Sequence, residues 1–260
     1  MIAHQKLVRD RIALEKEGDL FGRWWDEIDV DISKAVVRET TYATAKSLIE
    51  EYEWLGCMSA VSYFYYGIFF EGVCGGVVCY GPEYSENLGK ITRERGTSGA
   101  DWSRYGYEGS MILLNRGACT HWSHPHSASK LIRGSMKMLP KKYEVVTATV
   151  DDLAGEIGTI YQACGFHYVG SMRDGNANVS SRKGDRDAWL VDGKLYGSRN
   201  LRSKIGTTKM EEIKKIYPDV RKVKQNSKGR YFSFRGSKKV KRQHLAAIAD
   251  KIKPYPKRAG

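Results

Sequence analysis

The sequence predicts an α/β fold in which strands alternate with helices, followed by a basic C-terminal extension. Three observations support this prediction. Short apolar or alternating runs typical of strands alternate with runs at helical spacing. The stretch from Leu113 to Gly170 contains a strand, a Gly/Ser-rich loop, a helix, a second strand and a turn into another helix. Positive charge is concentrated after Lys194.

The N-terminal third contains a polar lead, a strand, a helix and two aromatic strands. Glu71 and Gly72 separate the two aromatic runs, which is a strong hairpin signal. The segments are, in order, 1 to about 30, Val30 to Arg38, Tyr42 to Tyr52, Tyr63 to Phe70, and Val73 to Tyr80.

A polar, glycine-rich insertion follows at about 81–109. Arg93, Arg95 and Arg104 are interleaved there with aromatic residues. Arginine near aromatic side chains suits contacts to phosphate and to unstacked bases. The alternative is a surface excursion without a function.

The central segment predicts a ligand site. A short strand at Met111 to Leu114 precedes a loop at Asn115 to Ser129, and helical spacing resumes at Lys130. The free backbone N–H groups of a helix start attract phosphate. Val145 to Val150 is a β-branched strand that ends in two aspartates, and a glycine-rich turn then leads into a helix at Thr159 to Cys164. Both strands therefore direct polar groups toward one region.

The remaining elements are a strand, a hairpin around Asp192 and Gly193, a helix, an alternating run and a final helix. We expect the core to close near the hairpin. This divides the chain into a catalytic core at 1–193, which includes the insertion, and a nucleic-acid-binding extension at 194–260 packed on it. The segments are Phe166 to Met172, Ala188 to Tyr196, Thr207 to Tyr217, Arg230 to Arg235 and Gln243 to Ile252.

Length and composition exclude several classes of protein. The 260 residues can bury a substantial core, no apolar run approaches the ~20 residues of a membrane span, and the N-terminus lacks the apolar core of a secretory signal. We therefore expect a cytoplasmic protein with no membrane partner. The five cysteines contain no C-x-x-C pair, so reduced thiols are expected rather than a disulfide framework or a zinc ribbon.

The charge distribution indicates a polyanionic partner. Residues 194–260 carry 21 Lys or Arg and 4 Asp or Glu, net +17, whereas the rest of the chain carries 22 basic and 26 acidic side chains, net −4. Nucleic acid is the favoured partner, because Lys and Arg contacts to phosphate release condensed counterions. A solvated surface and an anionic membrane are the alternatives. The candidate DNA contacts are Arg93, Arg95, Arg104, Arg199, Arg202, Lys204, Lys224, Lys228, Arg230, Lys238 and Lys239.

Several motifs resemble those of a known family. They are Leu114-Asn115-Arg116, Ser127 to Ile132, Val150-Asp151, Gly158 to Ala163, Tyr52 to Met58 and Pro254 to Arg258. Together they resemble the Mom-type DNA-adenine modification proteins of bacteriophages, which are divergent relatives of the GNAT N-acetyltransferase superfamily. The resemblance covers most of the chain. It implies a GNAT-like mixed central sheet flanked by helices.

The resemblance also implies a donor site for acetyl-coenzyme A or a related acyl donor. At the position where an ordinary acetyltransferase loop has Arg or Gln followed by spaced glycines, this chain has His124-Pro125-His126. A connector without a ligand is the alternative. The residues that would hold the donor are Arg116, Ser127, Ser129, Lys130, Gly158 and Thr159.

By the same resemblance, Asp151, Tyr52 and Tyr161 are the catalytic candidates. A carboxylate can accept or orient a proton of an exocyclic amine, and a tyrosine hydroxyl can protonate a leaving thiolate. Glu156 replaces a histidine that is common in the family. Structural roles are the alternatives, since Asp151 could cap the following turn and the two tyrosines could pack in the core.

A metal is a further candidate ligand. His121, His124 and His126 could supply imidazoles to iron or zinc, with His167 or Asp151 across the fold. Their spacing matches no closed metal motif. Hydrogen bonding or phosphate contact is the alternative for these loop histidines, and we assign no metal site.

The resulting hypothesis is a phage enzyme that transfers a small acyl-derived group, of carbamoylmethyl or methylcarbamoyl type, to the N6 amine of adenine in double-stranded DNA. The modification would protect the DNA from host restriction. Chemistry on this amine requires a flipped base, on which Tyr105, Trp122 or Tyr231 could stack. The alternatives are an acyltransferase acting on transfer RNA or protein, and a non-catalytic DNA-binding protein. The sequence does not predict an oligomeric state.

Overall fold

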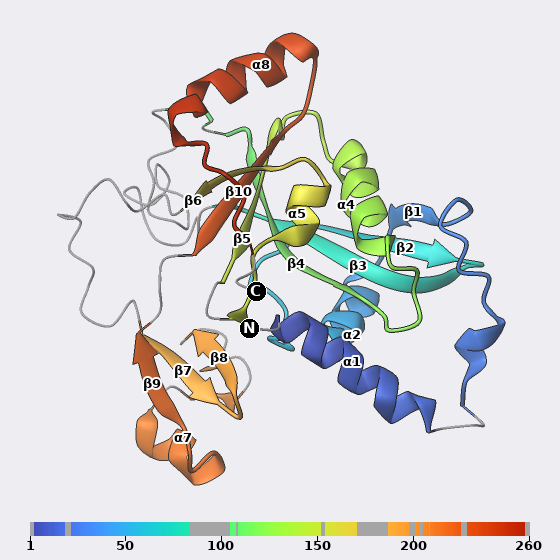
Figure 1. Ribbon diagram of the computed structural model, residues 1–260, viewed down its shortest axis with the longest axis vertical. Helices are drawn as coiled ribbons and strands as arrows, with labels where there is room; N and C mark the ends of the chain where they lie inside the picture. The colour runs from blue at the N-terminus through green and yellow to red at the C-terminus, as the bar shows by residue number, and fades with distance from the viewer. Residues whose placement is uncertain are drawn as a thin grey trace.

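The structure is a computed structural model in which a seven-stranded sheet forms the body of the molecule (Figure 1). The described residues are 3–18, 22–83, 105–107, 109–151, 154–170, 187–197, 201–202, 205–207, 209–224 and 228–257. In spatial order the strands are β1 (Val36–Glu39), β2 (Phe64–Phe70), β3 (Val73–Gly81), β4 (Met111–Cys119), β5 (Val145–Val150), β10 (Gly229–Phe234) and β6 (His167–Gly170).

Helices flank this sheet, and a second, three-stranded sheet lies at one end of it. The helices are α1 (His4–Glu17), η1 (Trp24–Glu27), α2 (Tyr42–Tyr52), α4 (Ser127–Met138), α5 (Thr159–Ala163), α7 (Met210–Ile216), α8 (Lys238–Ala247) and η5 (Ala249–Lys251). The second sheet has the order β8 (Lys194–Gly197), β7 (Asp187–Val191), β9 (Arg221–Lys224). The predicted mixed central sheet flanked by helices is confirmed.

One pair of strands in the main sheet is parallel and the other pairs are antiparallel. β4 and β5 run parallel only where Met111 to Leu114 face Val145 to Ala148. Beyond Leu114, β4 continues against β3, while β5 continues against β10. The two strands therefore separate along the second half of β4.

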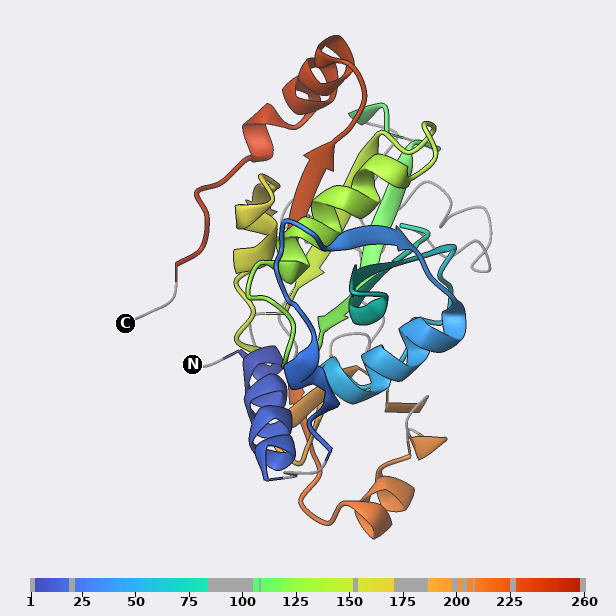
Figure 2. The same ribbon diagram turned by 90° about the vertical axis from the view of Figure 1, so that its right-hand side faces the viewer.

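Two hydrophobic clusters lie on opposite faces of the sheet. Val78 of β3 and Leu114 of β4 pack in one cluster with α4 and α5 residues, and Val77, the neighbour of Val78, packs in the other. Neighbouring strand residues point to opposite faces. The second cluster also contains residues of α1, α2 and the small sheet, so these elements cover the face opposite α4. Figure 2 shows α4 and α1 in the foreground of the turned molecule.

The β2–β3 hairpin and two further elements confirm the periodicity analysis. Glu71 and Gly72 at its turn have φ of 47° and 86°, the left-handed pair of a tight hairpin turn. α2 begins after Thr41, whose hydroxyl accepts a hydrogen bond from the N–H of Thr44 at 3.1 Å, and it ends at Tyr52 as expected. β5 also has the predicted bounds.

The C-terminal third is built into the main sheet. β10 lies between β5 and β6, with Tyr231 and Phe232 fully buried on its two faces. The expected boundary at 193/194 falls within the β7–β8 turn, where Val191 pairs with Lys194. Residues 194–260 are therefore not a simple extension, because the alternating run at 230–235 is apolar on both sides and completes the core. Figure 1 shows β7, β8, β9 and α7 at one end of the main sheet and α8 at the other.

Two other elements differ from expectation. β4 extends to Cys119, so Arg116 lies in a strand rather than in the loop. The small residues Gly117 and Ala118 pair with Val78 and Val77 of β3. α8 begins at Lys238 rather than near Gln243, because the Ser237 hydroxyl caps it by accepting a hydrogen bond from the N–H of Val240 at 3.3 Å.

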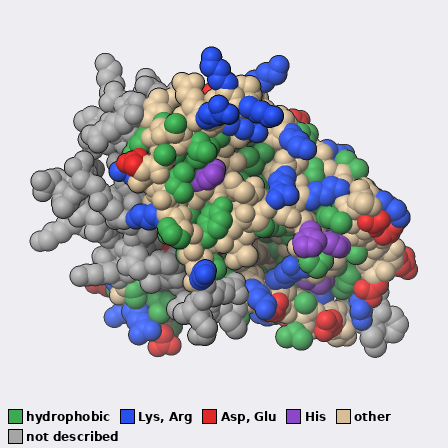
Figure 3. All heavy atoms as spheres, turned by 45° about the horizontal axis from the view of Figure 1, so that its top comes forward, with side chains coloured by type: hydrophobic (Ala, Val, Ile, Leu, Met, Phe, Trp, Pro, Cys, Tyr) green, Lys and Arg blue, Asp and Glu red, His purple; other side chains and the backbone are tan. Residues whose placement is uncertain are grey.

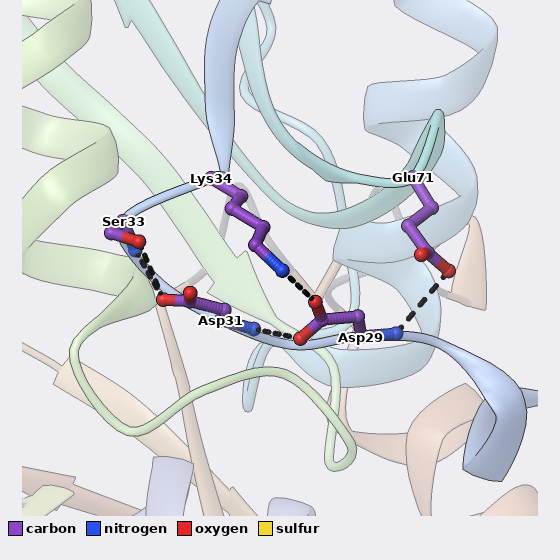
Figure 4. Close-up of polar contacts among 5 residues, drawn as sticks. All are labelled: Asp29, Asp31, Ser33, Lys34 and Glu71. Atoms are coloured by element: carbon purple, nitrogen blue, oxygen red, sulfur yellow. Dashed lines mark hydrogen bonds and ion pairs between the residues drawn. The ribbon is translucent and has the colours of Figure 1, made fainter.

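A polar network fixes the turn before β1 (Figure 4). The Asp29 carboxylate accepts hydrogen bonds from Lys34 Nζ at 2.5 Å and from the N–H of Asp31 at 3.0 Å, while Asp31 accepts from Ser33 at 2.8 Å. The N–H of Asp29 donates to Glu71 at 3.2 Å. The hydrogen bond from Lys34 lowers the pKa of Asp29, and that from Ser33 lowers the pKa of Asp31. This network ties the entry of β1 to the β2–β3 turn.

The cysteines are free thiols, as expected. Among the described residues, no helix is both long and apolar enough to cross a bilayer.

Candidate active site between two diverging strands

A cavity of about 410 Å³ lies where β4 and β5 separate. Its walls come from the second half of β4, the end of β5, the first turns of α1, α4 and α5, and the turn at 155–158. Within the described sheet, no strand pairs with the β5-facing edge of β4 beyond Leu114. Backbone polar groups on this edge can therefore bind a ligand.

The turn at 155–158 is held by side chains from behind it. Tyr231 Oη donates a hydrogen bond to the Ile157 carbonyl at 2.6 Å, and Gln162 Nε2 donates to the same carbonyl at 2.8 Å. Gly158 has φ of 71° and caps α5. A Cβ at this position would lie 2.4 Å from the Tyr231 ring, so only glycine fits.

Two glutamates line the cavity, Glu53 buried and Glu156 half-buried, and the sequence motifs assigned a role to neither. Glu53 is 8 % exposed, and its Oε2 accepts a hydrogen bond from the N–H of Leu55 at 2.9 Å. Burial raises its pKa to about 7, although the nearby Arg116 acts in the opposite direction. Glu156 accepts hydrogen bonds from Trp54 Nε1 and from the N–H of Asp151, both at 2.9 Å. Burial raises the pKa of Glu156 as well.

The cavity also contains cationic side chains from three elements. Arg116 of β4 is fixed by hydrogen bonds from Nε to the Cys57 carbonyl at 2.8 Å and from Nη1 to the Asn115 carbonyl at 2.7 Å. Lys6 and Arg9 of α1 and Lys228 before β10 also line it. Cations beside buried carboxyl groups suit an anionic or strongly polarised ligand.

Helix α1 positions the segment that carries Glu53. The Gln5 side chain donates to the Tyr52 carbonyl at 2.5 Å and accepts from the N–H of Trp54 at 3.0 Å. One side-chain amide is therefore hydrogen bonded to the backbone on both sides of Glu53. No sequence pattern predicts this contact, since a glutamine in a polar helix has no distinctive spacing.

The three catalytic candidates lie in different environments. Tyr161 lines the cavity, and burial raises its pKa, so its hydroxyl stays protonated. Asp151 is 3 % exposed and forms an ion pair with Lys228 at 3.5 Å, but its side chain is not part of the cavity wall. Tyr52 does not line the cavity, since its hydroxyl lies 3.1 Å from His121 Nδ1 and 3.4 Å from Lys16 Nζ.

The donor-site candidates divide into two groups. Arg116, Gly158 and Thr159 line the cavity. The other three do not: Ser127 is buried, Ser129 Oγ donates to the His126 carbonyl at 2.9 Å, and Lys130 Nζ donates to the Ile32 carbonyl at 2.5 Å. The start of α4 reaches the cavity through Ala128 instead.

The structure does not gather the three candidate histidines into a metal site. His121 bonds Tyr52, whereas His124 Nδ1 accepts a hydrogen bond from the N–H of His126 at 3.1 Å. In the part of the chain that the structure describes, no group of three or more His, Cys, Asp or Glu side chains is arranged to hold a metal ion.

Only some of the candidate DNA-contacting residues lie in the described part of the chain. Arg93, Arg95, Arg104, Arg199 and Lys204 lie outside the described residues, and Lys224 is a β9 residue whose side chain is not described. The exposed candidates are Arg202, Lys228, Lys238 and Lys239.

Arg230 is buried, in contrast to the exposed position expected of a phosphate contact. It is 2 % exposed and forms an ion pair with the buried Glu83 at 2.5 Å, so its charge is engaged inside the protein. Two of the proposed stacking residues are also engaged inside the protein. Tyr231 is fully buried, and Trp122 packs against Phe70.

One of the comparisons with known proteins agrees with the family expected from the motifs. A search of curated proteins finds no match. A crystal structure of an N-acetyltransferase from Staphylococcus aureus Mu50 aligns with a TM-score of 0.39 and 12% sequence identity, over 77% of this chain and 98% of that one. The model of the Mom protein family matches residues 34–257, which contain both cavity glutamates and most of the cavity wall. Because this match spans most of the sequence, the chain belongs to the Mom protein family.

Proposed function

We propose that this protein is a phage DNA modification enzyme that transfers a small acyl-derived group, of carbamoylmethyl or methylcarbamoyl type, to the N6 amine of adenine in duplex DNA. The observation that carries the proposal is the cavity between β4 and β5, which is lined by Glu53, Glu156 and Arg116 in a member of the Mom family. The product would protect the DNA from restriction in the host cytoplasm.

The proposed donor is a relative of acetyl-coenzyme A that already carries the amide nitrogen of the transferred group; acetyl-coenzyme A itself would transfer only an acetyl group. The unpaired edge of β4 offers hydrogen bonds to an amide-containing chain, as a neighbouring strand would. The start of α4 meets the cavity at Ala128, where unpaired N–H groups and the helix dipole favour phosphate. Lys6 and Arg9 face the same cavity and add positive charge. The volume of about 410 Å³ lies within the usual range for a small-molecule pocket.

The cavity carboxyl groups suit the proton transfer that the reaction requires. The adenine N6 atom forms a bond to the carbon of the transferred group and releases one proton, while the bond to the leaving group breaks and the leaving group takes up a proton. Glu53 has a pKa of about 7, which suits a group that accepts a proton near neutral pH. Tyr161, kept protonated by burial, is the proposed donor to the leaving group.

The test is to express the chain in bacteria and analyse the nucleosides of total DNA by mass spectrometry. The expected result is a new deoxyadenosine of higher mass, which disappears in the Glu53→Gln and Glu156→Gln variants and persists in the exposed control Glu50→Gln. Unchanged DNA with modified transfer RNA or protein would replace this function by the acyltransferase alternative. Unchanged nucleic acid and protein, with tight and salt-sensitive duplex binding, would indicate a DNA-binding protein without catalysis.

A further inference from the structure

A basic surface lies at the end of the main sheet opposite the cavity. α8 carries Lys238, Lys239, Lys241 and Arg242, all exposed, within five consecutive positions. Figure 3 shows basic side chains gathered over the end of the molecule that carries α8 in Figure 1. None of the four forms an ion pair with a described acidic residue.

The fold adds two lysines to this surface from a segment about a hundred residues earlier. The Arg235 guanidinium donates to the Leu139 carbonyl at 2.7 Å and to the Pro140 carbonyl at 3.1 Å, which holds the turn after α4 against the start of α8. Lys141 and Lys142, both exposed, lie in this turn. We name these six cations the end surface: Lys141, Lys142, Lys238, Lys239, Lys241 and Arg242.

Lys142 Nζ lies 4.9 Å from the centre of the Tyr143 ring, but the charges on α8 are not explained by the stability of the protein. Glu144, which follows the turn, is already hydrogen bonded to His244 Nε2 at 2.8 Å. Lysines in the first turn of a helix are unfavourable, because they face the positive end of the helix dipole. α8 has no acidic residue in its first turn to offset them. A cluster that opposes local stability indicates a binding role.

The chemistry of the surface favours a phosphate backbone over a membrane. Of the large exposed hydrophobic side chains in the described chain, none comes from α8 or from the turn at 139–143, and one, Met138, directly precedes this turn. Binding to a bilayer surface requires apolar side chains that insert below the headgroups. Nucleic-acid phosphates require only exposed Lys and Arg.

We propose that the end surface binds the phosphates of the DNA duplex at a fixed distance from the target adenine. This inference rests on the proposed function. β10 connects the two sites, since Gly229 pairs with Val150 at the cavity and Phe234 pairs with Val145 at the opposite end. A strand of this length spans about 20 Å. At about 3.4 Å per base pair, the end surface contacts the duplex about six base pairs from the flipped base.

The test compares variants of the full chain in binding to duplexes of two lengths at several salt concentrations. Lys141→Gln/Lys142→Gln removes two cations of the end surface, and Lys214→Gln/Lys215→Gln removes two adjacent exposed cations of α7, at the other end of the main sheet, as a matched control. On a duplex that extends about twelve base pairs beyond the adenine, the first variant should flatten the salt slope by about 0.9 for each lost phosphate contact. Lys238→Gln/Lys239→Gln should do the same, whereas the control should match the wild type.

On a duplex that extends only about four base pairs, the end-surface variants should bind like the wild type, because the DNA does not reach the surface. Equal slopes for the end-surface variants and the control on the long duplex would overturn the proposal, and so would an equal loss on both lengths. Thermal unfolding of each variant separates lost contacts from lost folding. Absence of modified adenine with the wild-type chain would reject the proposed function while leaving the binding result intact.

Discussion

Replacement of Glu53 by glutamine should remove a pH-dependent part of the stability. Glu53 is 8 % exposed, and burial raises its pKa from 4.5 to about 7. Glutamine has almost the same shape, and its side-chain oxygen can still accept the hydrogen bond that the N–H of Leu55 donates at 2.9 Å. The substitution therefore removes the titration and leaves the packing.

The sign and size of the effect follow from the difference between the folded and unfolded pKa values. Because the folded-state pKa is raised, the stability from this group is present below about pH 4.5 and is lost as the pH rises through about 7. A shift from 4.5 to about 7 corresponds to about 3 kcal/mol. At pH 8 the Glu53→Gln variant should therefore be more stable than the wild type by up to about 3 kcal/mol, whereas near pH 4.5 the two should be equal.

Urea denaturation of both proteins between pH 4.5 and 8 measures this difference directly. Glu156 also has a raised pKa and its charge raises the pKa of Glu53, so the same comparison is repeated in a Glu156→Gln background, where this coupling is absent. Glu50→Gln on the exposed face of α2 is the control for loss of a negative charge. A difference between wild type and variant that stays constant over this pH range would refute the assignment of a raised pKa to Glu53.

Other substitutions test the supports of the cavity and the core. Gly158→Ala should cost about 1–3 kcal/mol in urea denaturation, because alanine is strained at φ of 71° and its Cβ would meet Tyr231; an unchanged midpoint would contradict this. Arg230→Met should cost about 3–5 kcal/mol by leaving Glu83 without this ion pair, yet leave the salt slope of DNA binding unchanged; a flatter slope would return Arg230 to the DNA surface. Gln5→Ala should lower the free energy of unfolding by about 1 kcal/mol and should also lower the amount of modified adenine at temperatures where the variant is fully folded. Gln5→Asn should not restore the modification, because the shorter amide cannot reach both Tyr52 and Trp54.

Periodicity located most of the main sheet, but it failed where close packing decides the structure. The segment after Leu114 contains Gly117 and therefore resembles a loop, yet it continues as β4. A Cβ at Gly76 of β3 would lie 2.6 Å from Cys119 Sγ, so glycine permits the close approach of these two strands. This pairing depends on two segments that are distant in sequence. No local pattern in either segment predicts it.

The candidate site residues chosen from the sequence coincide only in part with the residues that line the cavity. Arg116, Gly158 and Tyr161 line the cavity as the resemblance implied. At the end of α2, however, Tyr52 turns toward His121 while the next residue, Glu53, faces the cavity. Spacing alone cannot distinguish two neighbouring residues where a helix gives way to a turn. The direction of each side chain depends on the two hydrogen bonds of the Gln5 side chain, which are tertiary contacts.

Helix α1 forms one wall of the cavity. It lies outside the matched residues 34–257, yet Gln5 orients the Glu53 segment and Arg9 donates hydrogen bonds to the carbonyls of His121 and Ser123, both at 3.3 Å. The diverging strands create the space, and they belong to the matched region. α1 supplies the positive charge of one cavity wall through Lys6 and Arg9, and its Gln5 positions the segment that carries Glu53. Changes in α1 can therefore alter the ligand that the cavity accepts without disturbing the sheet, since each of these contacts is made by a side chain at the edge of the core.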